Sequence, residues 1–434
     1  MNASQNNSKP LRRGLRPILG AIAGSMLLCM CGNSTHDTTE EDIVPFTTEW
    51  YDTLTNASAA TPELAGMDRD IKRFMDKWKL RGTTFAITRN DSLLYTQGYG
   101  WADAEAKTPM EATTVMRIAS ASKLITAIAL MRLVEEGKLS LDSKVFGPDG
   151  ILSDSVYTDA IADTRVMGLT VDHLLQHLGG FSRPWGDPMF NMAKVVKANR
   201  LSDAPSPEEL TQIILGRKMA AAPGERRKYS NFGYMLLSLI IEKASGQDYW
   251  SYVQENVMEP AGIAGFEKAG NYLSDRLPNE AKYYGPDNVK VEEFNGSGRM
   301  VDRTYGGNNI TGLLGAGGWL GNAAALARLV AVTDSCTSLR NILSPESTAA
   351  LTAYDPEANI CRGWVEIDDD GNWLRTGTLS SAHVLIKRYT DGECWVMTTN
   401  TGVWIGYKFA NDMDKLFDSL RAKYSSTLPA RNLW

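Results

Sequence analysis

The segment from Ser120 to Gly137 constrains the fold most, because it is typical of a helix that is apolar on almost every face. Its apolar side chains are Leu124, Ile125, Ile128, Leu130, Leu133 and Val134. A helix of this kind must be covered by protein on all sides. It is expected to end at Glu135-Glu136-Gly137, where the glycine can serve as the C-terminal cap. The chain must therefore build further layers around this segment.

Strand signals lie on both sides of a helical middle section. After a helix predicted over residues 68–80, apolar runs at 84–88 and 93–98 flank a short polar turn and indicate a hairpin. The C-terminal part has further runs at 363–367, 373–376, 382–388 and 394–400, separated by Asp-Gly turns, and ends in a helix over 409–424. Residues 165–265 are mostly helical, with a strong helix start at Ser206-Pro207-Glu208-Glu209. We predict an α+β fold, in which both chain ends build one antiparallel sheet with flanking helices and an all-helical subdomain.

The N-terminus has the pattern of an export signal. Lys9, Arg12, Arg13 and Arg16 precede an apolar run over 18–31, which is too short to span a bilayer comfortably. Cys31, at the end of this run, resembles the lipidated cysteine of a bacterial lipoprotein; ordinary secretion with cleavage nearby is the alternative. We therefore expect a signal peptide over 1–31, a flexible tether over 32–65 and a hydrolase domain over 66–426. The mature protein would be periplasmic or on the cell surface, with a lipid anchor in a bacterial membrane.

Composition and cysteine spacing exclude several classes of site. The net charge is −6 and the only notable Lys/Arg cluster lies in the export signal, so no nucleic-acid partner is expected. Two of the five cysteines lie in the export signal. The other three have no zinc-binding spacing, and any disulfide among them is left open; they are Cys336, Cys361 and Cys394. His173 and His177 have the i, i+4 spacing of metal ligands but lack the adjacent glutamate of metalloproteases. A structural role is favoured for both, and no metal site is predicted.

The first chemical motif is Ser120-Ala121-Ser122-Lys123, the only Ser-x-x-Lys in the chain. Residues three apart on a helix are neighbours, so the Lys123 amine can reach the Ser120 hydroxyl. A lysine held in low dielectric has a depressed pKa and can deprotonate a serine at a helix N-terminus. Taken alone, the motif is more often a helix cap followed by a solvated lysine.

Two further elements follow along the chain. Tyr229-Ser230-Asn231 is the only Tyr-x-Asn and leads directly into a helix, where a phenolate surrounded by cations could exchange a proton with a serine. Arg375-Thr376-Gly377-Thr378 lies on a strand, where a cation beside a glycine could hold the anionic end of a substrate. Each motif also has an ordinary structural interpretation. Tyr229 could be a packing aromatic with Asn231 as a helix cap, and the Arg375 motif could be a surface strand with a bulge at Gly377.

The three motifs in this order resemble the serine β-lactamase and penicillin-binding-protein family, which includes class C β-lactamases, D-alanyl-D-alanine carboxypeptidases and carboxylesterases. The stretches 116–139, 169–177 and 315–329 are also similar to that family, and the resemblance covers roughly residues 65–425. It implies an exported serine hydrolase that cleaves an ester or amide through an acyl-enzyme on Ser120. Lys123 and Tyr229 would act as general base and acid, and the backbone N–H groups of Ser120 and Thr378 would form the oxyanion hole.

The resemblance further implies that Asn231 orients Lys123 and the substrate, that Arg375, Thr376 and Gly377 bind the substrate, and that no cofactor is needed. Relatives usually carry Lys or His where this chain has Arg375, whose planar fork suits a substrate carboxylate. An α/β-hydrolase is excluded because no Gly-x-Ser-x-Gly occurs. The alternative is a catalytically weak binding or sensor paralogue. Peptidase, esterase and β-lactamase, acting on a small molecule or a peptide, are not distinguished, and neither is the oligomeric state.

Overall fold

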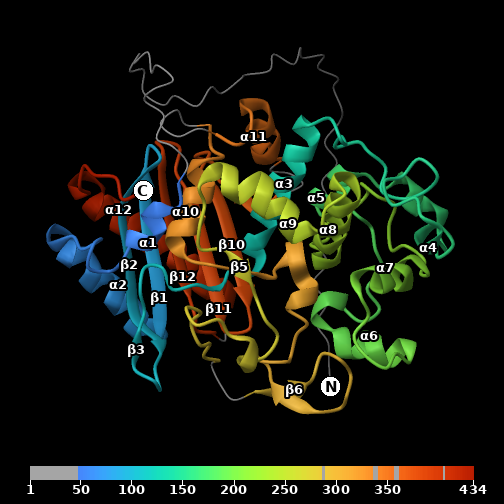
Figure 1. The fold of residues 1–434 in the computed structure, drawn as a ribbon, viewed down its shortest axis with the longest axis horizontal. Coiled ribbons are helices and arrows are strands. Elements are labelled where there is room, and N and C mark those ends of the chain that lie inside the picture. Colours follow the sequence, from blue (N-terminus) through green and yellow to red (C-terminus); the bar gives the residue numbers. More distant parts are fainter. Residues whose placement is uncertain (1–46, 286–288, 336–340, 356–360, 404–405) are drawn as a thin grey trace, which may run out of the picture.

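The computed structural model describes residues 47–285, 289–335, 341–355, 361–403 and 406–434. Its main sheet is antiparallel, with the strand order β3-β2-β1-β12-β11-β10-β9. The N-terminal strands are β1 (Gly82–Arg89), β2 (Ser92–Asp103) and β3 (Thr108–Pro109). The C-terminal strands are β9 (Glu366–Ile367), β10 (Trp373–Leu379), β11 (Ala382–Arg388) and β12 (Glu393–Thr399). The two chain ends meet where β1 pairs with β12, with Phe85 opposite Met397, so the predicted sheet is confirmed (Figure 1).

Each face of the sheet is covered by helices with an apolar side. On one face, α2 (Ala65–Trp78) and α12 (Gly406–Tyr424) enclose a core cluster that includes Phe74, Phe85, Trp395 and Phe417. On the other face lie α10 (Ala323–Ala331) and α3 (Ser122–Glu135), in the larger core cluster. The helix α3 has buried residues on every side, as its sequence predicts.

The helices between α3 and β5 form a separate group beside the sheet (Figure 1). They are α4 (Ser155–Thr158), α5 (Val171–Leu175), α6 (Met192–Asn199), α7 (Pro207–Leu215), α8 (Asn231–Ser245) and α9 (Tyr249–Val253). Ser206 caps α7 as predicted, since its side chain accepts a hydrogen bond from the Glu209 N–H. This group is the all-helical subdomain, and α8 packs against α3.

Shorter elements complete the chain. The small sheet β4-β8-β5 comprises β4 (Met116–Arg117), β8 (Trp319–Gly321) and β5 (Glu267–Lys268), and a two-stranded hairpin comprises β6 (Lys290–Glu292) and β7 (Met300–Asp302). The remaining α-helices are α1 (Glu49–Thr53) and α11 (Pro345–Thr352). Single turns of other helix types are η2 (Pro62–Leu64), η3 (Ala119–Ala121), η4 (Thr164–Gly168), η5 (Pro188–Phe190), η6 (Gln254–Met258), η7 (Glu259–Ala261), η8 (Leu273–Asp275), η9 (Thr311–Ala316) and η10 (Ser425–Thr427).

The folded unit is longer at both ends than the predicted 66–426. Within the predicted tether, α1 is packed on the body: Trp50 is buried, and its indole N–H donates to the carbonyl of Gly262 at 2.9 Å. Its ring also meets the Trp434 ring edge to face at 4.9 Å between centroids. The tether prediction is therefore wrong for this part, because it relied on polar composition and overlooked the apolar anchor at Trp50. The export signal and Cys31 lie outside the described residues.

Candidate active site

Ser120 lies in the turn that connects β4 to α3. The α-helix itself begins two residues later, at Ser122, so Ser120 belongs to η3 and not to the first α-helical turn as predicted. Ala119 adopts a φ of 50°, a left-handed conformation that is rare outside glycine. Non-glycine residues in this region cost energy and cluster at functional sites. The turn leaves Ser120 half-buried while Ala119 and Ala121 on either side are fully buried.

Lys123 is completely buried beneath Ser120. Its Nζ donates to Asn231 Oδ1 at 2.8 Å, to the carbonyl of Ala316 at 2.5 Å and to Ser120 Oγ at 3.4 Å. Burial lowers the pKa of Lys123 below its ordinary value, because water no longer solvates the ammonium. The charge of Arg375 acts in the same direction. A lysine in this setting gives up a proton more readily than one in solvent.

Tyr229 approaches Ser120 from the other side. Its hydroxyl donates to Ser120 Oγ at 2.8 Å, and Lys123 Nζ lies 5.0 Å from the centre of its ring. Burial by itself would raise the pKa of this phenol. The charges of Lys123 and Arg375, together with hydrogen bonds to Lys123 and Ser120, outweigh burial and lower the pKa to about 8. The phenolate is therefore accessible near neutral pH.

His177 supports Tyr229. The two rings pack with centroids 4.3 Å apart, and His177 Nδ1 accepts a hydrogen bond from the Ser230 N–H at 3.2 Å. Burial, reinforced by the charge of Lys123, holds the pKa of His177 well below its ordinary value, so this imidazole is neutral. His173 instead accepts from the Thr170 N–H at 3.2 Å as part of a helix cap. Both histidines thus have structural partners in the fold.

Asp187 is a site residue that the sequence did not reveal. Its Oδ2 accepts from the Asn231 side-chain amide at 2.9 Å and from the Asn231 backbone N–H at 3.2 Å. These bonds fix the amide so that its oxygen faces Lys123. The only local signal was Asp187 before Pro188, which indicates the start of a helical turn and not a contact with α8.

The sheet side of the site is formed by β10. Arg375 has only 1% of its surface exposed, and its Nε donates to the carbonyl of Ser120 at 2.9 Å, with Nη2 bonded to the same oxygen. A Cβ added to Gly377 would lie 2.4 Å from the Ile118 carbonyl oxygen and 3.3 Å from the Ser120 nitrogen. Glycine is therefore required for this close approach to the Ser120 turn. Thr376 is half-buried between these two residues.

Thr378 lines a cleft at the end of β10. Its side chain is exposed, and its Oγ1 lies 3.2 Å from Nδ1 of His383, the residue opposite it on β11. Burial lowers the pKa of His383 to about 4. The cleft has a volume of about 700 Å³ and is lined by residues that include Phe190, Arg303, Asn308, Thr378, Ser380 and His383. Of the predicted site residues in the described part of the chain, Thr378 lines this cleft, whereas Ser120, Lys123, Tyr229, Asn231 and Arg375 do not.

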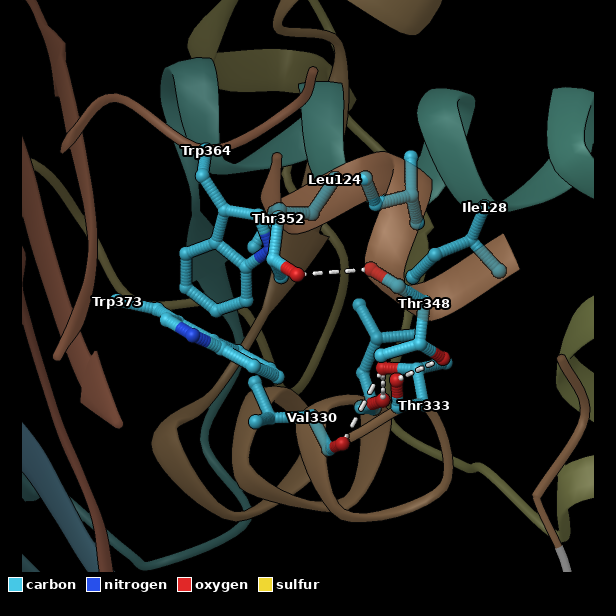
Figure 2. Close-up of a pocket in the computed structure, with 10 residues that line it drawn as sticks. Leu124, Ile128, Val330, Thr333, Thr348, Thr352, Trp364 and Trp373 are labelled. Carbon is cyan, nitrogen blue, oxygen red and sulfur yellow. Dashed lines mark hydrogen bonds between the residues drawn. The ribbon is translucent and has the colours of Figure 1, made fainter. Parts of the chain in front are cut away.

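A much smaller pocket lies between α3 and α11 and shares no lining residue with the cleft at Thr378. Figure 2 shows Leu124 and Ile128 of α3 facing Thr348 and Thr352 of α11 and Thr333, which follows α10, with two tryptophans closing one side. Its volume is about 10 Å³, and its threonine hydroxyls are hydrogen-bonded to carbonyls within the same wall, such as Thr352 to Thr348 at 2.9 Å. This pocket is a small void in the packing around α3.

The sequence left open whether any of the three C-terminal cysteines form a disulfide. Cys361 and Cys394 are buried free thiols, and Cys336 lies outside the described residues. None of the helices in the described ranges is both long and apolar enough to cross a membrane.

The model of the family described as Beta-lactamase matches residues 67–374. The chain belongs to the beta-lactamase family. This confirms the predicted resemblance and, with it, a β-lactamase-related serine hydrolase of unspecified activity. The match includes Ser120, Tyr229 and the start of β10.

Individual members of this family are more distant. Protein flp of Staphylococcus aureus is 28% identical over 232 residues, which is 53% of this chain and 43% of that protein. The chain thus spans less than half the length of the curated relatives that it matches. A penicillin-binding protein homologue from Pyrococcus abyssi has a TM-score of 0.59 at 22% identity, covering 85% of this chain and 78% of that one. A D-amino acid amidase from Ochrobactrum anthropi has a TM-score of 0.60 at 19% identity, covering 82% and 99%. These structures share the fold.

Proposed function

We propose that this beta-lactamase family member is an exported hydrolase that cleaves an ester or amide bond through an acyl-enzyme on Ser120. The observation that carries the proposal is the contact of Ser120 Oγ with two groups that can exchange a proton with it, the Tyr229 hydroxyl at 2.8 Å and Lys123 Nζ at 3.4 Å. A serine is a weak nucleophile until a neighbouring base takes its proton. A hydroxyl that serves only as a helix cap would not need both groups.

In the proposed reaction, Ser120 Oγ bonds to the acyl carbon while its proton passes to the Tyr229 phenolate. Lys123 stabilises that phenolate and can share the proton. The tetrahedral intermediate then expels the alcohol or amine, which takes the proton back from Tyr229. Water then gives a proton to the same pair and attacks the acyl carbon, and the pair returns that proton to Ser120 Oγ as the carboxylic acid leaves. The chain's own side chains account for each proton, and the proposal assigns no cofactor.

The oxyanion is assigned to the backbone N–H groups of Ser120 and Thr378. The closeness of Gly377 to the Ser120 nitrogen supports this, because it brings the β10 backbone alongside the turn. Such donors typically contribute about 3 kcal/mol to stabilisation of the transition state. Asn231, fixed by Asp187, is assigned the orientation of Lys123.

The test is covalent labelling of the purified protein with a fluorophosphonate and with a labelled penicillin, followed by peptide mass spectrometry. We expect fluorophosphonate label on Ser120, and its loss in Ser120→Ala with an unchanged circular dichroism spectrum. Label at another residue, or full hydrolysis by the variant, would refute the assignment. Labelling of Ser120 without turnover of any ester or amide would favour the binding or sensor paralogue. Penicillin labelling separates a β-lactam-recognising site from an esterase.

We further propose export to the periplasm or cell surface with a lipid on Cys31, which would attach the protein to the membrane. The support is the basic and apolar pattern that precedes Cys31. Mass spectrometry of the native N-terminus tests it, with a diacylglyceryl-modified Cys31 as the expected first residue. An unprocessed Met1 in the cytosol would refute export, whereas a cleaved but unmodified end would refute only the lipid.

A further inference from the structure

The buried guanidinium of Arg375 is in an unusual position for a substrate-binding group. It uses two N–H donors on one acceptor, the carbonyl oxygen of Ser120. Side chains alternate between the faces of a strand. Arg375 and Gly377 therefore face the nucleophile turn, while Thr376 and Thr378 take the other face. Only 1% of Arg375 is exposed, and none of the described carboxylates forms a salt bridge with it.

We infer that Arg375 is a positioning residue, which clamps the Ser120 carbonyl and keeps a permanent positive charge beneath the Ser120–Tyr229 pair, and that it does not bind an anionic group of the substrate. This inference rests on the proposed function. It departs from the sequence-based expectation, in which the fork of Arg375 faces a substrate carboxylate. A substrate carboxylate would need to displace the Ser120 carbonyl from a fully buried donor set.

Arginine suits this task better than lysine for two reasons. Its planar fork presents two N–H groups in fixed directions, so both can meet one carbonyl, whereas a lysine offers a flexible point charge. It also stays protonated when buried, whereas a buried lysine loses its charge easily. Lys123 is already such a lysine in this site. Arg375 therefore supplies the cation that does not depend on pH.

The groups that face Tyr229 show where this charge acts. Lys123 reaches it from α3, Arg375 from β10 and Tyr234 from α8, while His177 packs on its ring. Arg183 donates to the Tyr229 carbonyl oxygen. His177 is neutral, so Lys123 and Arg375 are the cations that stabilise the phenolate directly. Loss of the Arg375 charge should raise the Tyr229 pKa.

The consequence for substrates is that selectivity between neutral and carboxylate-bearing acyl compounds does not depend on Arg375. Beside the charged side chains of Lys194, Glu292, Asp302 and Arg303, the cleft is lined by hydroxyl and amide groups, among them Asn308, Ser380 and Ser381. Such groups recognise neutral carbonyl or amide substrates by hydrogen bonds. The exposed guanidinium of Arg303 on the cleft wall is the matched cation for comparison.

The experiment measures kcat and KM for a neutral ester and a matched carboxylate-bearing ester, from pH 6 to 10, in Arg375→Gln, Arg375→Lys and Arg303→Gln. For Arg375→Gln we expect kcat to fall about 100-fold on both esters, with the ratio of their KM values within about twofold of the parent. The pH at half-maximal kcat/KM should rise by about one unit. Arg375→Lys should raise that pH by less than Arg375→Gln does, because a buried lysine keeps its charge only in part, while losing about tenfold in kcat on both esters. Arg303→Gln should leave the pH at half-maximal kcat/KM unchanged, because the charge of Arg303 is screened by solvent.

A selective rise in KM for the charged ester in Arg375→Gln or Arg375→Lys, with an unmoved pH profile, would overturn the inference. If Arg375→Gln does not fold, Arg375→Lys still separates the two roles, because substrate binding predicts a KM effect on one ester and positioning predicts a kcat effect on both. Ser120→Ala on the same esters keeps the two proposals apart. Turnover by Ser120→Ala would refute the proposed function, whereas an inactive Ser120→Ala beside a selective KM effect would refute only the role of Arg375.

Discussion

The helical and the sheet sides of the candidate site are built differently. On the helical side, Ser120, Lys123, Tyr229 and Asn231 form hydrogen bonds with one another through their side chains. On the sheet side, Arg375 binds a backbone carbonyl and Thr378 turns its side chain toward His383 on the next strand. The helical side therefore carries the proton chemistry, and the sheet side fixes the backbone against which that chemistry takes place.

This difference follows from the periodicity of the two elements. Residues three apart on a helical segment are neighbours, so Ser-x-x-Lys already defines a contact. Adjacent residues on a strand face opposite sides, so a four-residue strand motif is divided between two surfaces. Each variant below tests one side of this comparison, in order of decreasing expected effect on turnover.

The largest effect is expected for Lys123→Met on the helical side. The variant removes a proton acceptor and the nearest cation to Tyr229, and it leaves the Asn231 and Ala316 oxygens without a donor. We expect kcat to fall by about 10³-fold or more, with loss of fluorophosphonate labelling. Steady-state kinetics and labelling rates measure this. Near-parental labelling in a folded Lys123→Met would show that Tyr229 alone activates Ser120.

Tyr229→Phe is expected to follow closely. The phenyl ring can keep its packing on His177, while the hydroxyl that contacts Ser120 is lost. General acid–base catalysis typically contributes 10²–10⁴-fold, so we expect a loss of about 10³-fold in kcat/KM. In the parent, kcat/KM should rise with pH through about 8, because the deprotonated phenol is the base. That rise should disappear in the variant, and a retained rise would assign the titration to another group.

The same periodicity explains how far sequence alone could go. The sheet from both chain ends was predictable because its strands are short apolar runs separated by polar turns, such as Asp-Gly in the C-terminal part. Ser120, Lys123 and Tyr229 could be proposed because their spacing and chain order are distinctive. The role of Asp187 could not be predicted from the sequence, because its contact with Asn231 joins two distant segments and depends on tertiary packing. The hydrogen bond from Arg375 to the Ser120 carbonyl could not be predicted either. A strand motif gives the residue types but not what each side chain contacts.

Asp187→Ala should have a moderate effect on the helical side. Without the carboxylate, the Asn231 amide can rotate, so Lys123 loses a fixed acceptor. We expect kcat to fall about tenfold, with KM little changed. In the double variant with Asn231→Ala, removal of Asp187 should add almost nothing, because both act through one contact. Full additivity in this double-mutant cycle would show that Asp187 acts elsewhere.

The smallest effect on turnover, and the clearest one on stability, is expected for His383→Gln on the sheet side. Its amide can still bond to Thr378, so kcat should change only a few-fold. His383 has a folded pKa of about 4, lowered by burial. In the unfolded chain it takes up a proton near pH 6.5, so protonation favours unfolding as the pH falls from about 6.5 to 4. This contribution to the free energy of unfolding is fully present above pH 6.5. It is lost as the pH falls from 6.5 to 4, by on the order of 3 kcal/mol.

Urea unfolding at pH 7, 5.5 and 4.5 measures this effect. As the pH falls, the free energy of unfolding should decrease less in His383→Gln than in the parent, with His177 unchanged in both as an internal reference. Parallel losses in the two proteins would show that His383 is protonated in the folded state, and its neutral contact with Thr378 would then have to be abandoned.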